Sequence, residues 1–303
     1  MSNSLLGQVA VVTGANSGVG RSATEMLLRA GAHVTMVCRS QERGEQALAE
    51  LRHATGTANK SGGGRVGELG GPRVALELAD LSRQDDVRQV ADRIAARLPA
   101  IDILVNNAGI LRGRRVLSVD GFELTFATNY LSHFLLTRLL LDRLEAGRGR
   151  VVNVSSCVHR VGSLRRAGLD DIARGRAWRG GMQAYSDSKL ANVLFTFESG
   201  RRWTGRGITA NALHPGVLWT GIWNVAPRAL RPLIRPFSRL LKKPEVGGAA
   251  VMYQVRDPAG DSGSGRYFNM QVAKNPSRQA QDPALARELW EQSLVWTANV
   301  ECG

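Results

Sequence analysis

Residues 8–20 read QVAVVTGANSGVG, an apolar run that ends in a glycine-rich turn. The run QVAVVT predicts a buried strand, and the residues from 19 onward have the spacing of a helix. Glycines at 14, 18 and 20 would let the backbone turn tightly, approach a pyrophosphate and pack the helix against the sheet. The helix would then present unpaired N–H groups and the positive end of its dipole to the phosphates. Because the turn follows the first strand of a βαβ unit, dinucleotide binding is favoured over an ordinary connecting turn.

The rest of the chain repeats this alternation of strand and helix. Strands are predicted at 8–13, 32–38, 74–80, 101–106, 150–155, 207–213 and 266–270. Helices are predicted at 19–30, 41–53, 84–98, 121–144, 183–201, 244–256 and 283–297. Strands that are apolar on both faces and separated by helices indicate a parallel, doubly wound sheet. We therefore expect an α/β fold of Rossmann type, a single domain over residues 1–303 with about seven parallel strands flanked by helices on both faces.

Two stretches depart from this pattern. TGTANKSGGGRVGELGG at 55–71 is rich in glycine and lies between a helix and a strand, so we interpret it as a flexible surface insertion. RALRPLIRPFSRLLKK at 228–243 interleaves apolar residues with cations at the period of a basic amphipathic helix. Pro232 and Pro236 would kink such a helix, so a broken lid over a pocket fits at least as well as peripheral contact with a membrane.

Charge and ligand spacing limit the partners. The net charge of +14 is compatible with a nucleic-acid partner, but only five of the forty basic residues are lysine and the arginines are scattered over every segment. This distribution favours a general arginine-rich composition, and no nucleic-acid partner is predicted. The five histidines have no carboxylate or cysteine companions at ligand spacing, so no metal site is predicted either.

The sequence also bears on the compartment. The longest apolar stretch, FLLTRLLLDRL at 134–144, is too short and too charged to span a membrane. The N-terminal residues lack the basic region and long apolar run of a signal peptide. Three cysteines without metal-ligand spacing fit a reducing compartment better than a disulfide framework, so we expect a cytoplasmic protein.

Tyr185 and Lys189 stand four residues apart in AYSDSKLANVLF, a segment with helical spacing. Four residues make about one helical turn, so the phenol and the ammonium would be neighbours on one face. By itself the pair fits either a catalytic site or a helix surface, because a four-residue pattern recurs by chance.

Further motifs in a fixed order favour the catalytic interpretation. TGxxxGxG at 13–20, NNAG at 106–109, Asn129, Ser156, YxxxK at 185–189 and PG at 215–216 together resemble the short-chain dehydrogenase/reductase family over residues 7–297. NYLSHFLLT, VVNVSS, AYSDSKLANVLF and LHPGV resemble its retinol dehydrogenase-like branch. The resemblance implies an oxidoreductase that transfers hydride from a CH–OH donor or, in reverse, to the corresponding carbonyl. It also implies a homo-oligomer.

The resemblance also implies a catalytic set of Asn129, Ser156, Tyr185 and Lys189. Tyr185 would be the acid/base, and since the pKa of a free tyrosine is about 10, the Lys189 ammonium and the charge of the oxidised nicotinamide are expected to lower it. Ser156 would orient the substrate oxygen, with Ser155 as the alternative. The backbone carbonyl of Asn129 would hold a water that links Lys189 to solvent.

By the same resemblance, the dinucleotide would lie along the carboxyl ends of the strands. Asp80 and Leu81 would border the adenine, 107–109 would line the ribose side, and 215–217 with Thr220 would meet the nicotinamide. The complete cofactor-binding set is Gly14, Asn16, Ser17, Gly18, Val19, Gly20, Arg39, Ser40, Asp80, Leu81, Asn107, Ala108, Gly109, Tyr185, Lys189, Pro215, Gly216, Val217 and Thr220.

The end of the second strand bears on the choice between NADP(H) and NAD(H). An NAD site usually has an acidic residue there, which binds the ribose hydroxyls and repels a 2′-phosphate. This chain has Cys38, Arg39 and Ser40 instead, and no carboxylate before Glu42. Arg39 can present its planar guanidinium to a phosphate and Ser40 can add a hydroxyl donor, so NADP(H) is the expected cofactor. Arg21 is a possible second cation.

Segments 157–184 and 217–243 follow the fifth and sixth strands and would form the substrate side, with 217–243 as a lid. Their apolar residues predict a pocket for a lipophilic alcohol, aldehyde or ketone. These residues are Val158, Val161, Leu164, Leu218, Trp219, Ile222 and Trp223. A retinoid, a steroid and a polyketide all remain open, because residues 165–181 match no pattern of the family.

A noncatalytic NADP(H)-binding regulatory or scaffold protein is the alternative, because a fold alone does not define an activity. The intact set of Asn129, Ser156, Tyr185 and Lys189 favours the enzyme, as does the unbroken glycine-rich turn.

Overall fold

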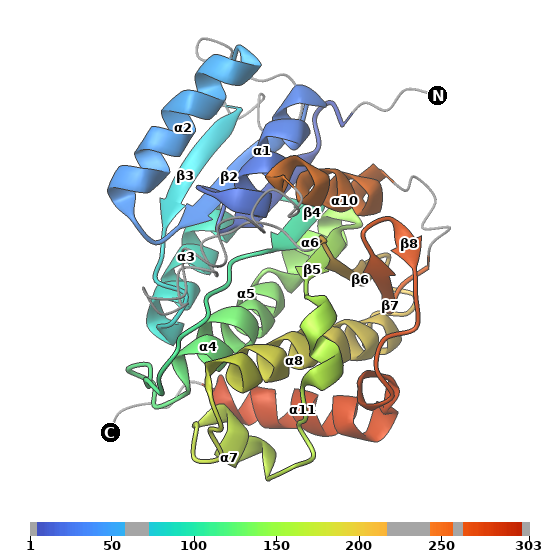
Figure 1. Cartoon of the computed structure of the whole chain (residues 1–303). Helices are drawn as coiled ribbons and strands as arrows, with labels where there is room; N and C mark the ends of the chain where they lie inside the picture. The colour runs from blue at the N-terminus through green and yellow to red at the C-terminus, as the bar shows by residue number, and fades with distance from the viewer. Residues whose placement is uncertain (1–4, 58–72, 217–242, 257–262, 299–303) are drawn as a thin grey trace.

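The computed structural model describes residues 5–57, 73–216, 243–256 and 263–298. One eight-stranded sheet runs through the molecule, with helices on both of its faces (Figure 1). The strand order is β3-β2-β1-β4-β5-β6-β7-β8, so the chain begins near the middle, builds one edge and then returns to build the other. This is the doubly wound arrangement that the sequence predicts.

The first seven strands are parallel, which confirms the prediction. They are β1 (Val9–Thr13), β2 (His33–Cys38), β3 (Val74–Leu78), β4 (Ile103–Asn106), β5 (Arg150–Val154), β6 (Thr209–His214) and β7 (Arg266–Asn269). An eighth strand, β8 (Val272–Ala273), pairs antiparallel with β7. It was not predicted, because two residues leave no periodicity in a sequence.

Alternate residues of the central strands enter two separate cores. Val9 and Val11 of β1 pack into one core, and Ala10 and Val12 into the other, as the period of two in a strand requires. The helices over the second core are α1 (Gly18–Arg29), α2 (Gln41–Thr55) and α10 (Pro244–Arg256). Those over the first are α3 (Gln84–Arg97), α5 (Ser132–Leu139) and α8 (Gly181–Arg202).

A further helix, α11 (Pro283–Trp296), packs along α8 and adds a third layer on that side (Figure 1). The Trp290 ring of α11 lies 5.1 Å from the ring of Phe134 and 5.8 Å from that of Phe195, measured between centroids. The long α8 is therefore buried over most of its surface.

The predicted continuous helix over 121–144 is wrong in its shape. The segment divides into α4 (Leu124–Phe126), a π-helical turn η1 (Ala127–Leu131), α5 and, after a break at Leu140, α6 (Leu141–Gly147). The π turn contains one residue more per hydrogen-bonded ring than an α-helix, which shifts the faces of the residues that follow.

The segments on the substrate side are more structured than the sequence suggests. A 3-10 turn η2 (Cys157–Val161) and a short helix α7 (Leu169–Ala173) lie between β5 and α8, and a 3-10 turn η6 (Gln279–Gln281) precedes α11.

No helix of the described residues is long and apolar enough to cross a membrane.

Two predicted segments fall largely outside the described residues. Of the insertion predicted at 55–71, the structure describes residues 55–57, where α2 ends at Thr55 and is capped by Gly56 in the left-handed conformation (φ 65°). Residues 58–72, and the lid at 217–243 apart from Lys243, are not among the described residues.

Candidate active site

The glycine-rich turn between β1 and α1 has the geometry expected of a phosphate-binding turn. Gly14 and Gly18 have positive φ angles of 65° and 56°, which side chains other than glycine rarely adopt. A Cβ atom at Gly20 would lie 2.4 Å from Asn107 Nδ2 and from the Gly14 oxygen, so only glycine fits. Ser17 precedes α1 and its side chain makes no capping hydrogen bond, which leaves the first N–H groups of the helix for a ligand.

The turn at the end of β4 is fastened to the end of β1. Asn107 Nδ2 donates to the Thr13 oxygen at 2.8 Å, and the backbone N–H groups of Asn107 and Ala108 donate to Thr13 Oγ1 at 2.9 and 3.0 Å. Asn107, Ala108 and Gly109 therefore lie beside the glycine-rich turn, in the place that the sequence predicts. A Cβ atom on Gly109 would lie 3.5 Å from both Lys189 Nζ and Asn129 Oδ1, so the backbone here adjoins the predicted catalytic residues.

The adenine-side residues lie at the same edge of the sheet. The Asp80 carboxylate accepts from the Ser82 N–H at 3.0 Å and from the Ser82 hydroxyl at 2.8 Å, which fixes its orientation just after β3. Leu81 beside it is buried.

Arg39 follows β2 directly and is exposed, with no hydrogen bond or ion pair to another described residue. Ser40 caps α2 by accepting from the Arg43 N–H at 3.4 Å. Arg21, the possible second cation, forms a partly exposed ion pair with Glu50 at 2.7 Å. Arg43 is a cation that the sequence analysis missed. It lies on the first turn of α2, close enough to Cys38 to act on its thiol.

The Tyr185–Lys189 pair lies on α8, which runs beside the end of β5. Lys189 Nζ lies 5.6 Å from the centroid of the Tyr185 ring and donates to the backbone oxygen of Val154 at 2.9 Å. The Ser156 side chain lies close enough to the Tyr185 hydroxyl to lower its pKa. Both members of the pair are buried, with 8% and 3% of their surface exposed.

The direction of one pKa shift differs from the expectation. Burial raises the pKa of Tyr185 above its usual value, and the nearby Ser156 side chain offsets this only in part. Burial also lowers the pKa of Lys189 to about 8. Removing both groups from water disfavours the charged form of each, and within the protein alone this effect outweighs the attraction between phenolate and ammonium.

The two serines at the end of β5 have different partners. Ser155 Oγ donates to the backbone oxygen of Lys189 at 2.8 Å and is buried, so it fastens α8 to the sheet. Ser156 is half-buried and faces Tyr185. The geometry favours Ser156 over the alternative, Ser155, for contact with a substrate oxygen.

Asn129 lies in the middle of the π turn and joins three elements. Its side chain accepts from the Ile110 N–H at 2.7 Å, donates to the Ile110 oxygen at 2.9 Å and donates to Ser188 Oγ at 3.0 Å. Its backbone oxygen, the predicted holder of a water, accepts a hydrogen bond from the His133 ring at 3.0 Å.

The predicted nicotinamide side is described only in part. Pro215 and Gly216 follow β6, and Gly216 has a positive φ of 98°. Val217 and Thr220 lie outside the described residues.

Three of the predicted pocket residues are described. Val158 is half-buried near the site and Val161 is exposed, whereas Leu164 packs into the core and is not a pocket wall. Leu218, Trp219, Ile222 and Trp223 lie outside the described residues.

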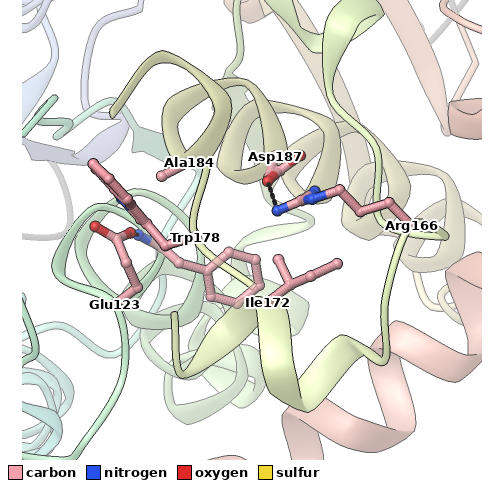
Figure 2. A pocket seen from close by; sticks show the side chains of 7 residues that line it. Glu123, Arg166, Ile172, Trp178, Ala184 and Asp187 are labelled. Carbon is pink, nitrogen blue, oxygen red and sulfur yellow. Dashed lines mark hydrogen bonds and ion pairs between the residues drawn. The ribbon is translucent and has the colours of Figure 1, made fainter. Parts of the chain in front are cut away.

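A small cavity beside α8, which contributes Ala184 and Asp187 to its lining, was not predicted (Figure 2). The cavity is lined by Glu123, Phe126, Arg166, Ile172, Trp178, Ala184 and Asp187. Asp187 forms an ion pair with Arg166 at 2.8 Å and accepts from the Ser163 N–H at 2.8 Å, which ties the segment after η2 to α8. Burial raises the pKa of both Glu123 and Asp187.

Within the part of the chain that the structure describes, no group of three histidine, cysteine or acidic side chains is arranged to hold a metal ion.

Comparisons with known proteins identify the family of the chain. The sequence profile of the short chain dehydrogenase family matches residues 8–168. Retinol dehydrogenase 13 of Mus musculus is 37% identical over 295 residues, which covers 95% of this chain and 83% of that protein. Human dehydrogenase/reductase SDR family member 13 is 39% identical over 293 residues, which covers 95% and 73%.

Among solved structures, an uncharacterised protein from Mycobacterium paratuberculosis superposes with a TM-score of 0.74 at 31% identity, covering 97% of this chain and 94% of that one. The chain belongs to the short-chain dehydrogenase family of oxidoreductases. Within that family it is retinol dehydrogenase-like, since several retinol dehydrogenases are among its similar relatives.

Proposed function

We propose that the protein is an NADP(H)-dependent oxidoreductase that interconverts a lipophilic alcohol and its aldehyde or ketone, with Tyr185 as the acid/base. The observation that carries the proposal is the convergence of Ser156, Tyr185 and Lys189 at the end of β5, beside the glycine-rich turn. A nicotinamide bound there would supply the hydride and, when oxidised, a positive charge. The fit of such a cofactor is supported by the glycine backbone of the turn and the uncapped start of α1.

The protein residues divide the proton chemistry between them. Ser156 would hold the substrate oxygen while Tyr185 gives it a proton during reduction, or takes one during oxidation. Because burial raises the pKa of Tyr185, the protonated phenol is the stable form in the protein alone, as a proton donor requires. The ammonium of Lys189 would stabilise the phenolate that forms when the proton leaves.

The preference for NADP(H) rests on the surface at the end of β2. Arg39 is exposed and has no carboxylate partner among the described residues, and Arg43 lies one turn further on. Two cations and the Ser40 hydroxyl suit a 2′-phosphate, which a carboxylate at this place would repel. An RhlG/NADP complex from Pseudomonas aeruginosa, 25% identical to this chain with a TM-score of 0.65, supports the proposal.

The names of the relatives favour a lipophilic substrate. The retinol dehydrogenases among them are named for a lipophilic alcohol, and the described part of the substrate side adds the apolar Val158. A panel of retinal, steroid ketones and aliphatic aldehydes, followed at the NADPH absorbance band, tests this part of the proposal. A protein that turned over none of them, or only a sugar or small acid, would contradict it.

The choice of cofactor is tested by comparing kcat/KM for NADPH and NADH in the wild type and in Arg39→Ala. A charge-assisted phosphate contact contributes about 1.5–3 kcal/mol, so the wild type should favour NADPH by about tenfold or more. Arg39→Ala should lose most of that preference and leave the use of NADH nearly unchanged. Arg287→Ala is the matched control, since Arg287 is also exposed but lies on α11. Equal use of both cofactors by the wild type would overturn the assignment.

A further inference from the structure

The buried ring of His133 connects the cofactor side of the site to the catalytic side. His133 lies at the start of α5, four residues after Asn129, with 1% of its surface exposed. Its Nε2 atom lies 2.9 Å from Thr13 Oγ1 and its Nδ1 atom lies 3.0 Å from the backbone oxygen of Asn129. Thr13 immediately precedes the glycine-rich turn, so one side chain touches both halves of the site.

The partners of the ring determine its protonation. A backbone oxygen can only accept, so Nδ1 must carry the hydrogen that is donated to Asn129. Burial and the nearby charge of Lys189 lower the pKa of His133 to about 4, so the ring is neutral at physiological pH. Nε2 is therefore an acceptor, and the hydrogen between it and Thr13 comes from the threonine hydroxyl.

The hydroxyl of Thr13 has four hydrogen-bonding neighbours. It accepts from the backbone N–H groups of Asn107 and Ala108, at 2.9 and 3.0 Å. Its own hydrogen has two acceptors within reach, His133 Nε2 at 2.9 Å and the Val105 oxygen at 3.3 Å, and His133 is the nearer. With that hydrogen donated to His133, the bonds lead from the end of β4 through Thr13 and His133 to the Asn129 oxygen.

The Asn129 carbonyl lies where the hydrogen-bonding scheme of the helix changes. The N–H of Ser132 donates to the Ala127 oxygen, five residues back, as in a π turn. Side chains also donate to the next two carbonyls, Ser132 Oγ to the Thr128 oxygen at 2.8 Å and His133 Nδ1 to the Asn129 oxygen at 3.0 Å.

We propose that His133 is a positioning residue that fixes the Asn129 carbonyl relative to the glycine-rich turn and so sets the geometry of the proton path from Lys189. The proposal rests on the function proposed above for Asn129 and Lys189. The side chains of those two residues converge on Gly109, which places the oriented carbonyl at the same end of the sheet as the ammonium.

Two substitutions separate the two bonds of the ring. In His133→Asn the amide nitrogen can take the place of Nδ1 and donate to Asn129, whereas in His133→Gln the amide oxygen can take the place of Nε2 and accept from Thr13. We expect His133→Asn to keep kcat within about threefold of the wild type. His133→Gln should lower kcat by about tenfold or more with little change in KM for NADPH, as the loss of about 1.4 kcal/mol at the transition state requires.

The control is Ser132→Ala, which removes the equivalent bond to the neighbouring Thr128 carbonyl and should leave kcat unchanged. Melting temperatures of all three variants separate a loss of position from a loss of fold. Equal kcat in the Asn and Gln variants, or losses of kcat that simply follow the melting temperature, would overturn the proposal.

A spectroscopic measurement tests the bonds without any turnover. The ¹⁵N shifts of histidine-labelled protein should show His133 neutral and protonated at Nδ1 at about pH 6, assigned by its loss in His133→Asn. A ring protonated at Nε2 alone, or charged at that pH, would contradict the bond to Asn129. A wild type that turns over no substrate but shows the expected shifts would refute the proposed function and leave the hydrogen-bonded connection intact.

Discussion

Ser155 and Ser156 show how neighbouring residues of one type can have separate roles. Their side chains leave the end of β5 toward opposite sides, as in any extended segment. One reaches the backbone of α8 at Lys189, and the other reaches the hydroxyl of Tyr185. The first bond is structural and the second lies where a substrate oxygen would bind.

Substituting each serine by alanine separates these roles. Ser155→Ala removes a buried hydrogen bond and should lower the free energy of unfolding by about 1 kcal/mol, with a small effect on kcat. Ser156→Ala should lower kcat by about 100-fold and leave the free energy of unfolding nearly unchanged. Denaturant unfolding and steady-state kinetics check both, and the opposite pattern would assign the substrate contact to Ser155.

The sequence motifs predicted the candidate catalytic residues. They did not predict the residues that hold those side chains in position. Asn129, Ser156, Tyr185 and Lys189 were predicted because a recognisable motif surrounds each. His133 lies within the motif NYLSHFLLT but was given no role, because its partner Thr13 is 120 residues away and only the fold brings them together. The pairing of Arg21 with Glu50 and the burial of Leu164 also depend on tertiary contacts, which the sequence does not show.

At the scale of elements, strands were predicted better than helices. Buried parallel strands are short and apolar on both faces, so their positions can be read from composition alone. The division of 121–144 left no comparable signal, because the π turn contains neither glycine nor proline. Its residues are all buried, and packing decides the turn where local preference does not.

Glu123, the buried acid that caps α4 just before this turn, should titrate in a way that is visible in the stability of the protein. Its folded pKa is raised by burial, so the unfolded chain loses this proton first as the pH rises above about 4.5. Stability then falls until the folded pKa is passed and stays lower above it. The loss is about 1.4 kcal/mol for each pH unit that separates the folded pKa from the unfolded pKa.

Glu123→Gln removes this titration and keeps an oxygen that can accept from the Phe126 N–H, as Glu123 does at 2.8 Å. The variant should therefore gain stability relative to the wild type between pH 4 and pH 7, measured by denaturant unfolding at each pH. The neighbouring Asp187 titrates in both proteins, so its contribution largely cancels. If the stability difference between Glu123→Gln and the wild type were the same at pH 4 and at pH 7, the described burial of Glu123 would be contradicted.

At the scale of the molecule, α8, the helix that carries Tyr185 and Lys189, lies between the sheet and α11. Trp290 of α11 packs against aromatic rings of α8 and its C-cap, 5.8 Å from Phe195 and 6.4 Å from Trp203 between ring centroids, and lies 5.1 Å from Phe134 of α5. The family profile ends at residue 168, so both of these helices lie beyond its match. The position of Tyr185 thus depends on a layer that the profile does not cover.

Trp290→Ala tests the contribution of that layer. Removing a buried tryptophan should lower the free energy of unfolding by about 3–5 kcal/mol, because the cavity left between α8 and α11 cannot close fully. Well below the melting temperature, KM for NADPH should change little, since the cofactor turn lies on other elements. Val295→Ala, an exposed position on the same helix, is the control. A loss of stability no larger than in this control would contradict the described packing.

Hydride transfer with proton exchange at Tyr185 is tested most directly by the turnover of Tyr185→Phe with NADPH and a lipophilic carbonyl that the wild type reduces. The ring and its packing remain, so the melting temperature and NADPH binding, followed by cofactor fluorescence, should match the wild type. Loss of the hydroxyl removes the proton donor that Ser156 holds in place, and we expect kcat to fall by about 100-fold or more. A folded Tyr185→Phe variant that binds NADPH and reduces the carbonyl at the wild-type rate would contradict the assignment of Tyr185 as the acid/base.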